Sequence, residues 1–265
     1  MDLMHALWLA ILQGVTEFLP ISSSGHLILA PVLFGWQDQG LAFDVAVHFG
    51  TFSAVVYYFR HDVVTMTRAW LASLGSGPRS ADSDLAWCVI WGTVPAVIAG
   101  AALAGEVATL LRSPFVIAAA TAGFGIVLWI ADARGERYRD VRSISWRDAL
   151  LIGLAQALAL VPGTSRSGIT MTAGLLLGLT REASARFSFL LSMPLILAAA
   201  VWELLALVRD PEPADWVALA VGAVVSGVVA YATIRLFLAW LGRVGMAPFA
   251  IYRLLLAALL YLIYV

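Results

Sequence analysis

Apolar residues run through most of the chain in long stretches, and charged residues are concentrated in the short breaks between them. Such stretches are typical of helices that cross a membrane, because about 20 helical residues span a hydrocarbon core of about 30 Å. The runs fall into two series, the first at 3–19, 24–34, 41–59, 85–103 and 114–131 and the second at 146–161, 167–179, 183–208, 216–241 and 248–265. The pattern predicts an all-α integral membrane protein.

The opening pair of runs in each series includes one that is too short to cross a membrane. An 11-residue run such as 24–34 rises only about 16 Å as a helix. We therefore expect each opening pair to form a re-entrant helical hairpin, at 3–34 and at 147–179, which leaves six transmembrane helices. The irregular tips at 20–24 and 162–167 are tolerable at membrane depth only where they are buried in protein or line a wet cavity.

The two series also match in spacing, which indicates a repeat. Gln13 and Gln156 each stand twelve residues before a glycine, Gly25 or Gly168, that closes a serine-rich loop. With three spans after each hairpin, the second copy enters the membrane from the side opposite to the first, so we predict two inverted-topology repeats. The predicted division is a first repeat at 1–133, an arginine-rich linker at 134–146 and a second repeat at 147–265.

Arginine supplies all sixteen basic residues, and its positions test this topology. If both hairpins return to the side from which they enter, only Arg112 and Arg209 of the arginines in the breaks lie on one face. The opposite face holds Arg60, Arg68, Arg79, Arg134, Arg137, Arg139, Arg142, Arg147, Arg181, Arg186, Arg235 and Arg243. The positive-inside rule then places that face in the cytoplasm and both termini outside. The two hairpin tips can therefore meet near the midplane.

Composition supports a lipid environment and excludes several other classes. The chain is 62% hydrophobic and 12% charged, with a mean hydropathy of +0.90, more apolar than a soluble domain can cover with polar surface. A net charge of −1 gives no footprint for nucleic acid. Cys88 is the single cysteine, so no intrachain disulfide is expected. No basic stretch precedes the first apolar run, so we do not expect a cleaved secretory signal.

The first predicted hairpin carries two oxygen-bearing side chains on one helix face. Gln13 and Glu17 are four residues apart, and Pro20 ends the helix soon afterwards. Ionisable groups inside a membrane segment are costly, so Glu17 is a candidate for function. Hard cations such as Mg²⁺ and Ca²⁺ take carboxylate and amide oxygens. The alternative is a hydrogen bond that only pins the hairpin.

The tip of this hairpin reads Ser22-Ser23-Ser24-Gly25-His26. Serine hydroxyls and free N–H groups at the start of a helix form a cradle for an anion, although serines also cap helices that bind nothing. Gly25 lets the backbone approach a ligand closely. His26 follows directly, where it acts either as a general base or as a donor to a phosphoryl oxygen, or is simply a structural histidine.

The tip of the second hairpin reads Pro162-Gly163-Thr164-Ser165-Arg166-Ser167-Gly168. An unpaired guanidinium at membrane depth is very costly, so Arg166 must face an anion, either Glu17 or a phosphate. Asp44 and His48 share one face of the following span and are weaker candidates. Arg253, in the last span, is expected to pair within the bundle.

These two motifs, with the stretch 187–194 and the overall length, resemble the bacterial undecaprenyl-diphosphate phosphatase family, also called bacitracin-resistance proteins. The resemblance covers essentially the whole chain. It implies hydrolysis of undecaprenyl diphosphate to undecaprenyl phosphate and inorganic phosphate, which recycles the lipid carrier of cell-wall synthesis. It also implies an inner-membrane site open to the periplasm and a divalent cation, Mg or Ca. Gln13 is no departure, because the family motif accepts Glu or Gln there.

The residues and the resemblance together give a predicted site. Catalysis is assigned to Glu17, Ser23, His26 and Arg166, phosphate binding to Ser22, Ser24, Gly25, Thr164, Ser165, Ser167 and Gly168, and the cation to Gln13 and Glu17. The predicted partners are a polyprenyl diphosphate lipid and the bilayer, without nucleic acid. The nucleophile stays open between Ser23, His26 and water, and so does the question of a homodimer.

Two other classes compete with this assignment. A lipid flippase or transporter is the main rival, because inverted repeats with broken helices are also a transport architecture. An acid-phosphatase-like lipid phosphatase, suggested by Ser24-Gly25-His26, fits poorly because no histidine follows Arg166 in the chain.

Overall fold

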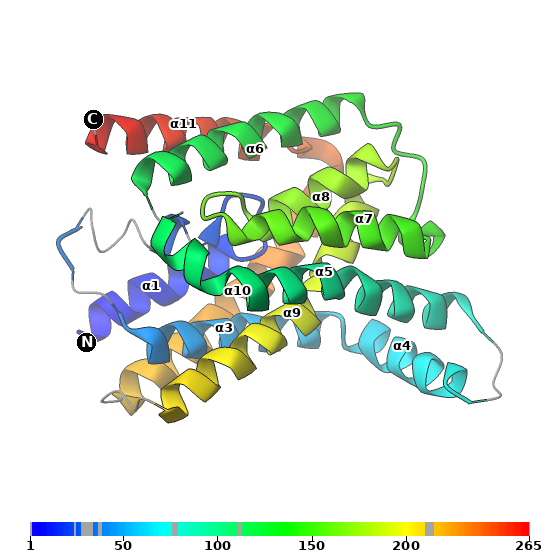
Figure 1. Cartoon of the computed structure of the whole chain (residues 1–265), viewed down its shortest axis with the longest axis horizontal. Coiled ribbons are helices and arrows are strands. Elements are labelled where there is room, and N and C mark those ends of the chain that lie inside the picture. Colours follow the sequence, from blue (N-terminus) through cyan, green and yellow to red (C-terminus); the bar gives the residue numbers. More distant parts are fainter. Residues whose placement is uncertain are drawn as a thin grey trace.

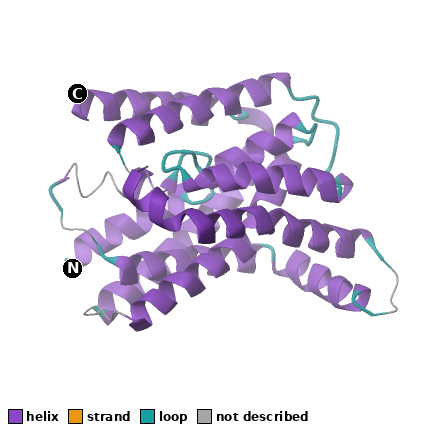
Figure 2. Ribbon diagram, viewed as in Figure 1, coloured by secondary structure: helices purple, strands orange, loops and turns teal. Residues whose placement is uncertain are grey.

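The structure, a computed structural model, describes residues 2–23, 25–27, 34–36, 39–75, 79–110, 113–209 and 215–264, with the backbone alone at 104–110. Within these ranges the chain is built of helices and loops, as Figure 2 shows, and the β-pairing is a single isolated bridge between Arg139 and Leu179. The protein is therefore all-α, as predicted.

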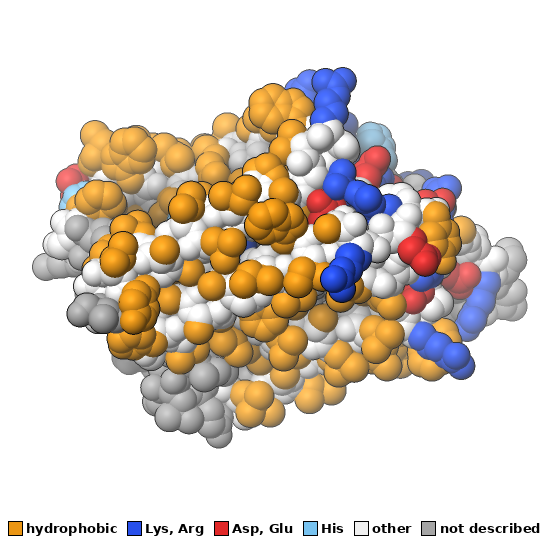
Figure 3. All heavy atoms as spheres, turned by 90° about the horizontal axis from the view of Figure 1, so that it is seen from above, with side chains coloured by type: hydrophobic (Ala, Val, Ile, Leu, Met, Phe, Trp, Pro, Cys, Tyr) orange, Lys and Arg blue, Asp and Glu red, His pale blue; other side chains and the backbone are white. Residues whose placement is uncertain are grey.

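Six helices of the described chain are long and apolar enough to cross a membrane. They are α3 (Leu41–Tyr58), α5 (Ala81–Leu110), α6 (Pro114–Arg134), α9 (Arg181–Arg209), α10 (Trp216–Val244) and α11 (Ala247–Tyr264). Figure 3 shows hydrophobic side chains over most of one face, with charged side chains gathered at one end. That apolar surface suits lipid, and the prediction of six spans in an all-α membrane protein is confirmed.

The remaining helices are shorter. They are α1 (Leu3–Thr16), α4 (Arg60–Ser73), α7 (Trp146–Ala157) and α8 (Arg166–Leu176). The sequence analysis missed α4, because this helix is short and its polar start reads as a break between spans. Met66 is the buried residue of this helix and belongs to the main hydrophobic core, and Val63 and Trp70 pack against that core, so one face of α4 contacts the bundle at its charged end.

Local sequence explains where α7 begins and ends. Ser145 and Asp148 form a capping box at its start, and Arg139 donates to the Asp148 carboxylate at 2.7 Å. Burial raises the pKa of Asp148, but the hydrogen bonds from Arg139 and Ser145 lower it by more, so its pKa lies below the ordinary value. A 3₁₀ turn at Leu158–Leu160 and then Pro162 end the helix.

Helix packing pairs each short opening helix with a span of the other half. α1 packs on α10, and α7 packs on α5. Small residues allow the second of these contacts: a Cβ added at Gly153 of α7 would lie 2.3 Å from the carbonyl oxygen of Gly92 in α5. α3 lies between α9 and α10, and α6 packs on both α8 and α11.

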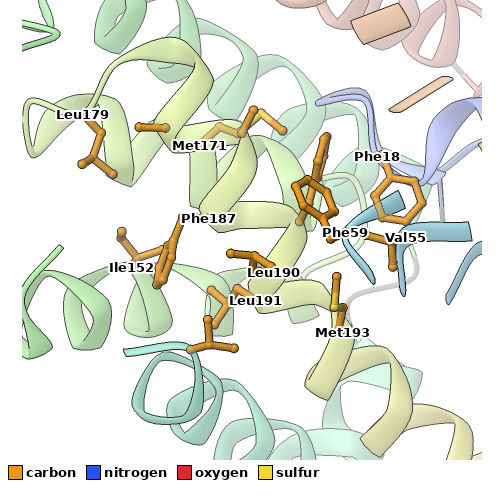
Figure 4. Packing of buried hydrophobic residues seen from close by; sticks show 14 of the residues in the cluster. Phe18, Val55, Phe59, Ile152, Met171, Leu179, Phe187, Leu190, Leu191 and Met193 are labelled. Atoms are coloured by element: carbon orange, nitrogen blue, oxygen red, sulfur yellow. The ribbon is translucent and has the colours of Figure 1, made fainter. Parts of the chain in front are cut away.

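The main hydrophobic core lies beside the loop that follows α1. Phe18 of that loop meets Phe189 of α9 edge to face, with ring centroids 5.3 Å apart. Figure 4 shows Phe18 beside Val55 of α3 and near Phe59, which separates α3 from α4, within a cluster that continues through α9 to Ile152 of α7. The loop is therefore anchored by an aromatic side chain that is fully buried.

A buried ion pair ties three spans together at the charged end. Asp132 of α6 accepts two hydrogen bonds from Arg181 at the start of α9, at 2.5 and 2.9 Å. The same carboxylate accepts the N–H of Met246, between α10 and α11, at 3.0 Å. Since Asp132 is buried and fully hydrogen-bonded, this pair fixes the relative positions of the helices that surround the loops.

Candidate active site

Two loops meet inside the bundle. The first loop, 17–27, follows α1, and the second loop, 158–168, leads from α7 into α8. Figure 1 shows α1 starting at the end where both termini lie and α7 starting at the opposite end. Arg166 of the second loop donates to Glu17 of the first at 2.8 Å, and Ser167 donates to the Leu19 carbonyl oxygen at 2.8 Å. The structure thus brings Glu17 and Arg166 together, whereas the re-entrant form of the two predicted hairpins stays a prediction.

Glu17 accepts hydrogen bonds from three side chains. Arg166 binds Oε1, while Gln13 and Ser23 donate to Oε2 at 3.1 and 2.8 Å. Arg166 also donates to the Ser188 carbonyl oxygen at 3.3 Å and lies 5.9 Å from the centre of the Phe18 ring. Glu17 and Arg166 are 8% and 12% exposed, so the ion pair is buried at the junction of the loops.

The two loops share an unusual local conformation. Ser22 and Ser165 have φ angles of 75° and 70°, in the left-handed region that a non-glycine residue rarely adopts. Each serine hydroxyl accepts the N–H of the glycine three residues later, Gly25 at 3.4 Å and Gly168 at 3.1 Å. The matched motifs therefore form matched turns, and the second turn leads into α8.

Gly163 is required for a close approach between the second loop and α6. Its φ angle is +91°, and an added Cβ would lie 2.4 Å from the carbonyl oxygen of Ile117. No other residue fits this position without displacing α6. The carbonyl of Gly163 then accepts a hydrogen bond from the Thr121 hydroxyl at 3.3 Å.

His26 also lies in the first loop, but its side chain has different hydrogen-bond partners from that of Ser23. Its Nδ1 is 2.6 Å from the Ser22 carbonyl oxygen, and its Nε2 is 2.5 Å from the Tyr252 hydroxyl of α11. The two rings stack with centroids 5.6 Å apart. Since the Ser23 hydroxyl donates to Glu17, the structure connects Ser23 with the carboxylate and His26 with α11.

Arg253 is the residue whose role the sequence analysis underestimated. Its side chain is fully buried and donates to backbone carbonyl oxygens of both loops. The acceptors are Pro20 at 3.3 Å, Gly163 at 2.9 Å, Thr164 at 2.8 Å and Thr121 of α6 at 3.0 Å. An arginine within an apolar span was the signal, but the sequence does not show that its partners are carbonyl dipoles of two distant loops.

Comparison with known proteins identifies the family of the chain. A model of the family described as bacitracin resistance protein BacA matches residues 6–259. The chain belongs to the BacA family. A protein named undecaprenyl-diphosphatase in Nitrosococcus oceani is 58% identical over 264 residues, covering 100% of both chains. Undecaprenyl-diphosphatase 2 of Stutzerimonas stutzeri is also 58% identical, covering 100% of this chain and 99% of its own.

The remaining predicted site residues of this BacA family chain lie around the same junction. Ser165 and Ser167 have hydroxyl oxygens 3.2 Å apart, and both are buried, as are Gly25, Gly168 and Thr164. Ser24 lies outside the described residues. Asp44 accepts a hydrogen bond from Gln39 at 3.0 Å, and its carbonyl lies 2.7 Å from Nδ1 of His48.

The donor set can also be tested against the cation that the sequence predicted. Gln13 Oε1 is buried and has no hydrogen-bond partner among the described residues. The described residues contain no group of three His, Cys, Asp or Glu side chains around a common point. One carboxylate and one amide oxygen therefore suit a cation such as Mg²⁺ that takes its remaining ligands from water and phosphate oxygens.

Proposed function

We propose that this BacA family chain hydrolyses undecaprenyl diphosphate to undecaprenyl phosphate and inorganic phosphate, which recycles the lipid carrier and confers bacitracin resistance. Its full-length relatives named undecaprenyl-diphosphatase support this assignment. The observation that carries it is the buried contact between Glu17 and Arg166. It gathers a guanidinium, a carboxylate and a hydroxyl inside an apolar bundle, as a substrate with a charged head and an apolar tail requires.

Arg166 is the proposed clamp for the terminal phosphate. Its planar guanidinium matches two phosphate oxygens, and it stands at the start of α8, where free N–H groups favour an anion. Ser165, Ser167 and Gly168 surround the same helix start. The ion pair with Glu17 holds this arginine ready without substrate, and the phosphate then takes part of its hydrogen bonding.

Ser23 is the nucleophile in the proposed mechanism. Its Oγ–H donates to Glu17, so the carboxylate takes this proton as Oγ bonds to the terminal phosphorus and the bond from that phosphorus to the bridging oxygen breaks. Undecaprenyl phosphate leaves as an anion. Water then attacks the phosphoserine, its proton goes to His26, and Glu17 returns a proton to Ser23 as inorganic phosphate departs.

Trapping labelled phosphate on the protein distinguishes the nucleophiles. We expect an adduct that is stable in acid and labile in alkali, because a phosphoserine has this stability. An acid-labile adduct would instead assign the attack to His26, and turnover without any adduct would assign it to water. The Ser23→Ala variant serves as the control, since it removes the hydroxyl and should carry no adduct.

Gln13 and Glu17 are the residues that would hold a divalent cation beside the substrate. Such an ion would supply positive charge to the diphosphate in addition to that of Arg166. We place the charged end of the bundle in the cytoplasm and the site toward the periplasm, with the halves as inverted repeats. The matched turns at Ser22 and Ser165 support the repeat, and side-specific labelling of a cysteine placed at Arg137 tests the orientation.

Phosphate release from the purified protein in detergent tests the function directly. We expect release from C55 and C15 diphosphates, loss of release with a chelator and recovery with Mg²⁺ or Ca²⁺. The reason is that one arginine cannot neutralise the two to three charges of a diphosphate. If no phosphate is released with any of these cations, the phosphatase proposal is refuted and a flippase is favoured. If release is complete in the presence of chelator, only the proposed cation is refuted.

A further inference from the structure

His26 is held by two groups that come from opposite directions. Its Nδ1 lies 2.6 Å from the Ser22 carbonyl oxygen in its own loop, and its Nε2 lies 2.5 Å from the hydroxyl of Tyr252. His26 is buried, whereas the Tyr252 ring is 41% exposed on α11. The tyrosine therefore forms the outer wall of the histidine site, and its hydroxyl reaches inward.

The partners determine which ring nitrogen carries the proton. A carbonyl oxygen can only accept, so Nδ1 must carry a hydrogen, and in the neutral ring Nε2 then bears the lone pair. The Tyr252 hydroxyl donates to that lone pair. The nearly parallel rings, 9° apart in orientation, restrict rotation of the imidazole about its side-chain bonds. The contact thus fixes both the direction and the hydrogen bonding of Nε2.

We propose that Tyr252 connects His26 with the attacking water in the phosphatase reaction, so that Nε2 receives the proton that the water loses through the tyrosine hydroxyl. This inference rests on the proposed function. The water gives its proton to the phenol oxygen as the phenol's own proton passes to Nε2, so the hydroxyl is regenerated and then accepts the new Nε2–H, since a phenol oxygen both donates and accepts.

The adjacent residue makes α11 the carrier of this arrangement. Arg253 follows Tyr252 and binds the carbonyl oxygens of Pro20, Gly163 and Thr164. Two consecutive side chains of α11 therefore bind the site: Arg253 binds the backbone of both loops, and Tyr252 binds the imidazole of His26. The contact between Tyr252 and His26 can therefore be removed while the arginine contacts stay.

The Tyr252→Phe variant makes that separation, because it deletes one oxygen and keeps the stacked ring. We expect kcat for phosphate release to fall about tenfold with KM within about twofold, the loss of one hydrogen bond in the reacting state. Tyr261→Phe is the matched control on the same helix. Tyr261 pairs only with the Phe115 ring in the described residues, so its variant should keep wild-type kinetics.

A double-mutant cycle with His26→Gln shows whether the Tyr252 hydroxyl acts through His26 or affects kcat independently, through packing. If Tyr252 acts through His26, the double variant has the kcat of His26→Gln alone, whereas independent effects multiply. Multiplied effects, or wild-type kcat in Tyr252→Phe, would overturn the proposal.

Nitrogen NMR of histidine-labelled protein gives a readout that does not depend on activity. The chain has four histidines, and His26→Gln identifies the relevant signals. We expect the Nε2 resonance of His26 to move downfield toward that of a free acceptor nitrogen in Tyr252→Phe, with the Nδ1–H signal retained. An unchanged Nε2 signal would refute the hydrogen bond even if the wild type is an active phosphatase, and failure of the phosphatase assay would leave this measurement intact.

Discussion

Arg166→Gln is expected to lower phosphate release by about a thousandfold. The substitution removes the only charged side chain that the second loop brings to Glu17, and the terminal phosphate loses its bidentate partner. Purified protein assayed with C55 diphosphate at saturating cation measures the loss. Arg166→Lys should be nearly as inactive, because an ammonium ion keeps the charge but cannot bind two phosphate oxygens in one plane.

Arg186→Gln is the matched control for this prediction. Arg186 pairs with Asp62 at the charged end, where both side chains are about a third or more exposed, so its loss should leave activity unchanged. Near-normal turnover in Arg166→Gln would refute the site. Since a buried Glu17 without its arginine also threatens folding, elution as a single species in gel filtration must accompany the assay.

Arg253→Met is expected to lower the free energy of unfolding by about 3 kcal/mol or more and to abolish activity. The variant leaves the buried carbonyl oxygens of Pro20 and Thr164 without the arginine that donates to them, and Gly163 keeps only the Thr121 hydroxyl. Thermal unfolding in detergent measures the first effect. Arg253→Lys should have a stability between those of the wild type and Arg253→Met, because one ammonium group reaches fewer of these carbonyls.

Arg243→Met provides the comparison for Arg253. Arg243 lies exposed in the last turn of α10, so its replacement should change stability by less than about 0.5 kcal/mol. Equal losses in the two variants would show that the buried carbonyl contacts add nothing beyond the removal of any arginine.

The sequence predicted the membrane class, the six spans and the meeting of Glu17 with Arg166. The reason is that the cost of burying charge in lipid leaves few arrangements, so one carboxylate and one guanidinium at two loop tips must find each other. It did not predict that Ser23 donates to Glu17 while His26 contacts Tyr252. Ser23 and His26 belong to the same short motif. Only the backbone path of the loop determines which way each side chain points.

Long-range partners explain the other omissions. Arg253 and Tyr252 are more than two hundred residues from Pro20 and His26, and nothing local in α11 indicates those contacts. α4 was missed for a different reason, since its 14 residues are too few to cross the membrane and its start at Arg60-His61-Asp62 reads as a polar break. Local pattern thus defines the helices, whereas the partners of a single buried polar side chain depend on the assembled bundle.

The halves have also diverged at the junction. Leu160 occupies the place in the second loop that corresponds to Glu17, while the matched serines keep their turn. One loop therefore supplies the carboxylate, the hydroxyl and the imidazole, and the other supplies the guanidinium.

The hydrogen bonds between α11 and both loops have a consequence for biosynthesis. This helix is the last of the described chain to be made, so the loops emerge and insert before the side chains of Tyr252 and Arg253 exist to hold them. Until α11 inserts beside α6, the carbonyl oxygens of Pro20 and Thr164 lack the arginine that donates to them. The contacts of Tyr252 and Arg253 with the loops therefore form only when α11 is in place, and a chain released before that helix is made carries both motifs without them.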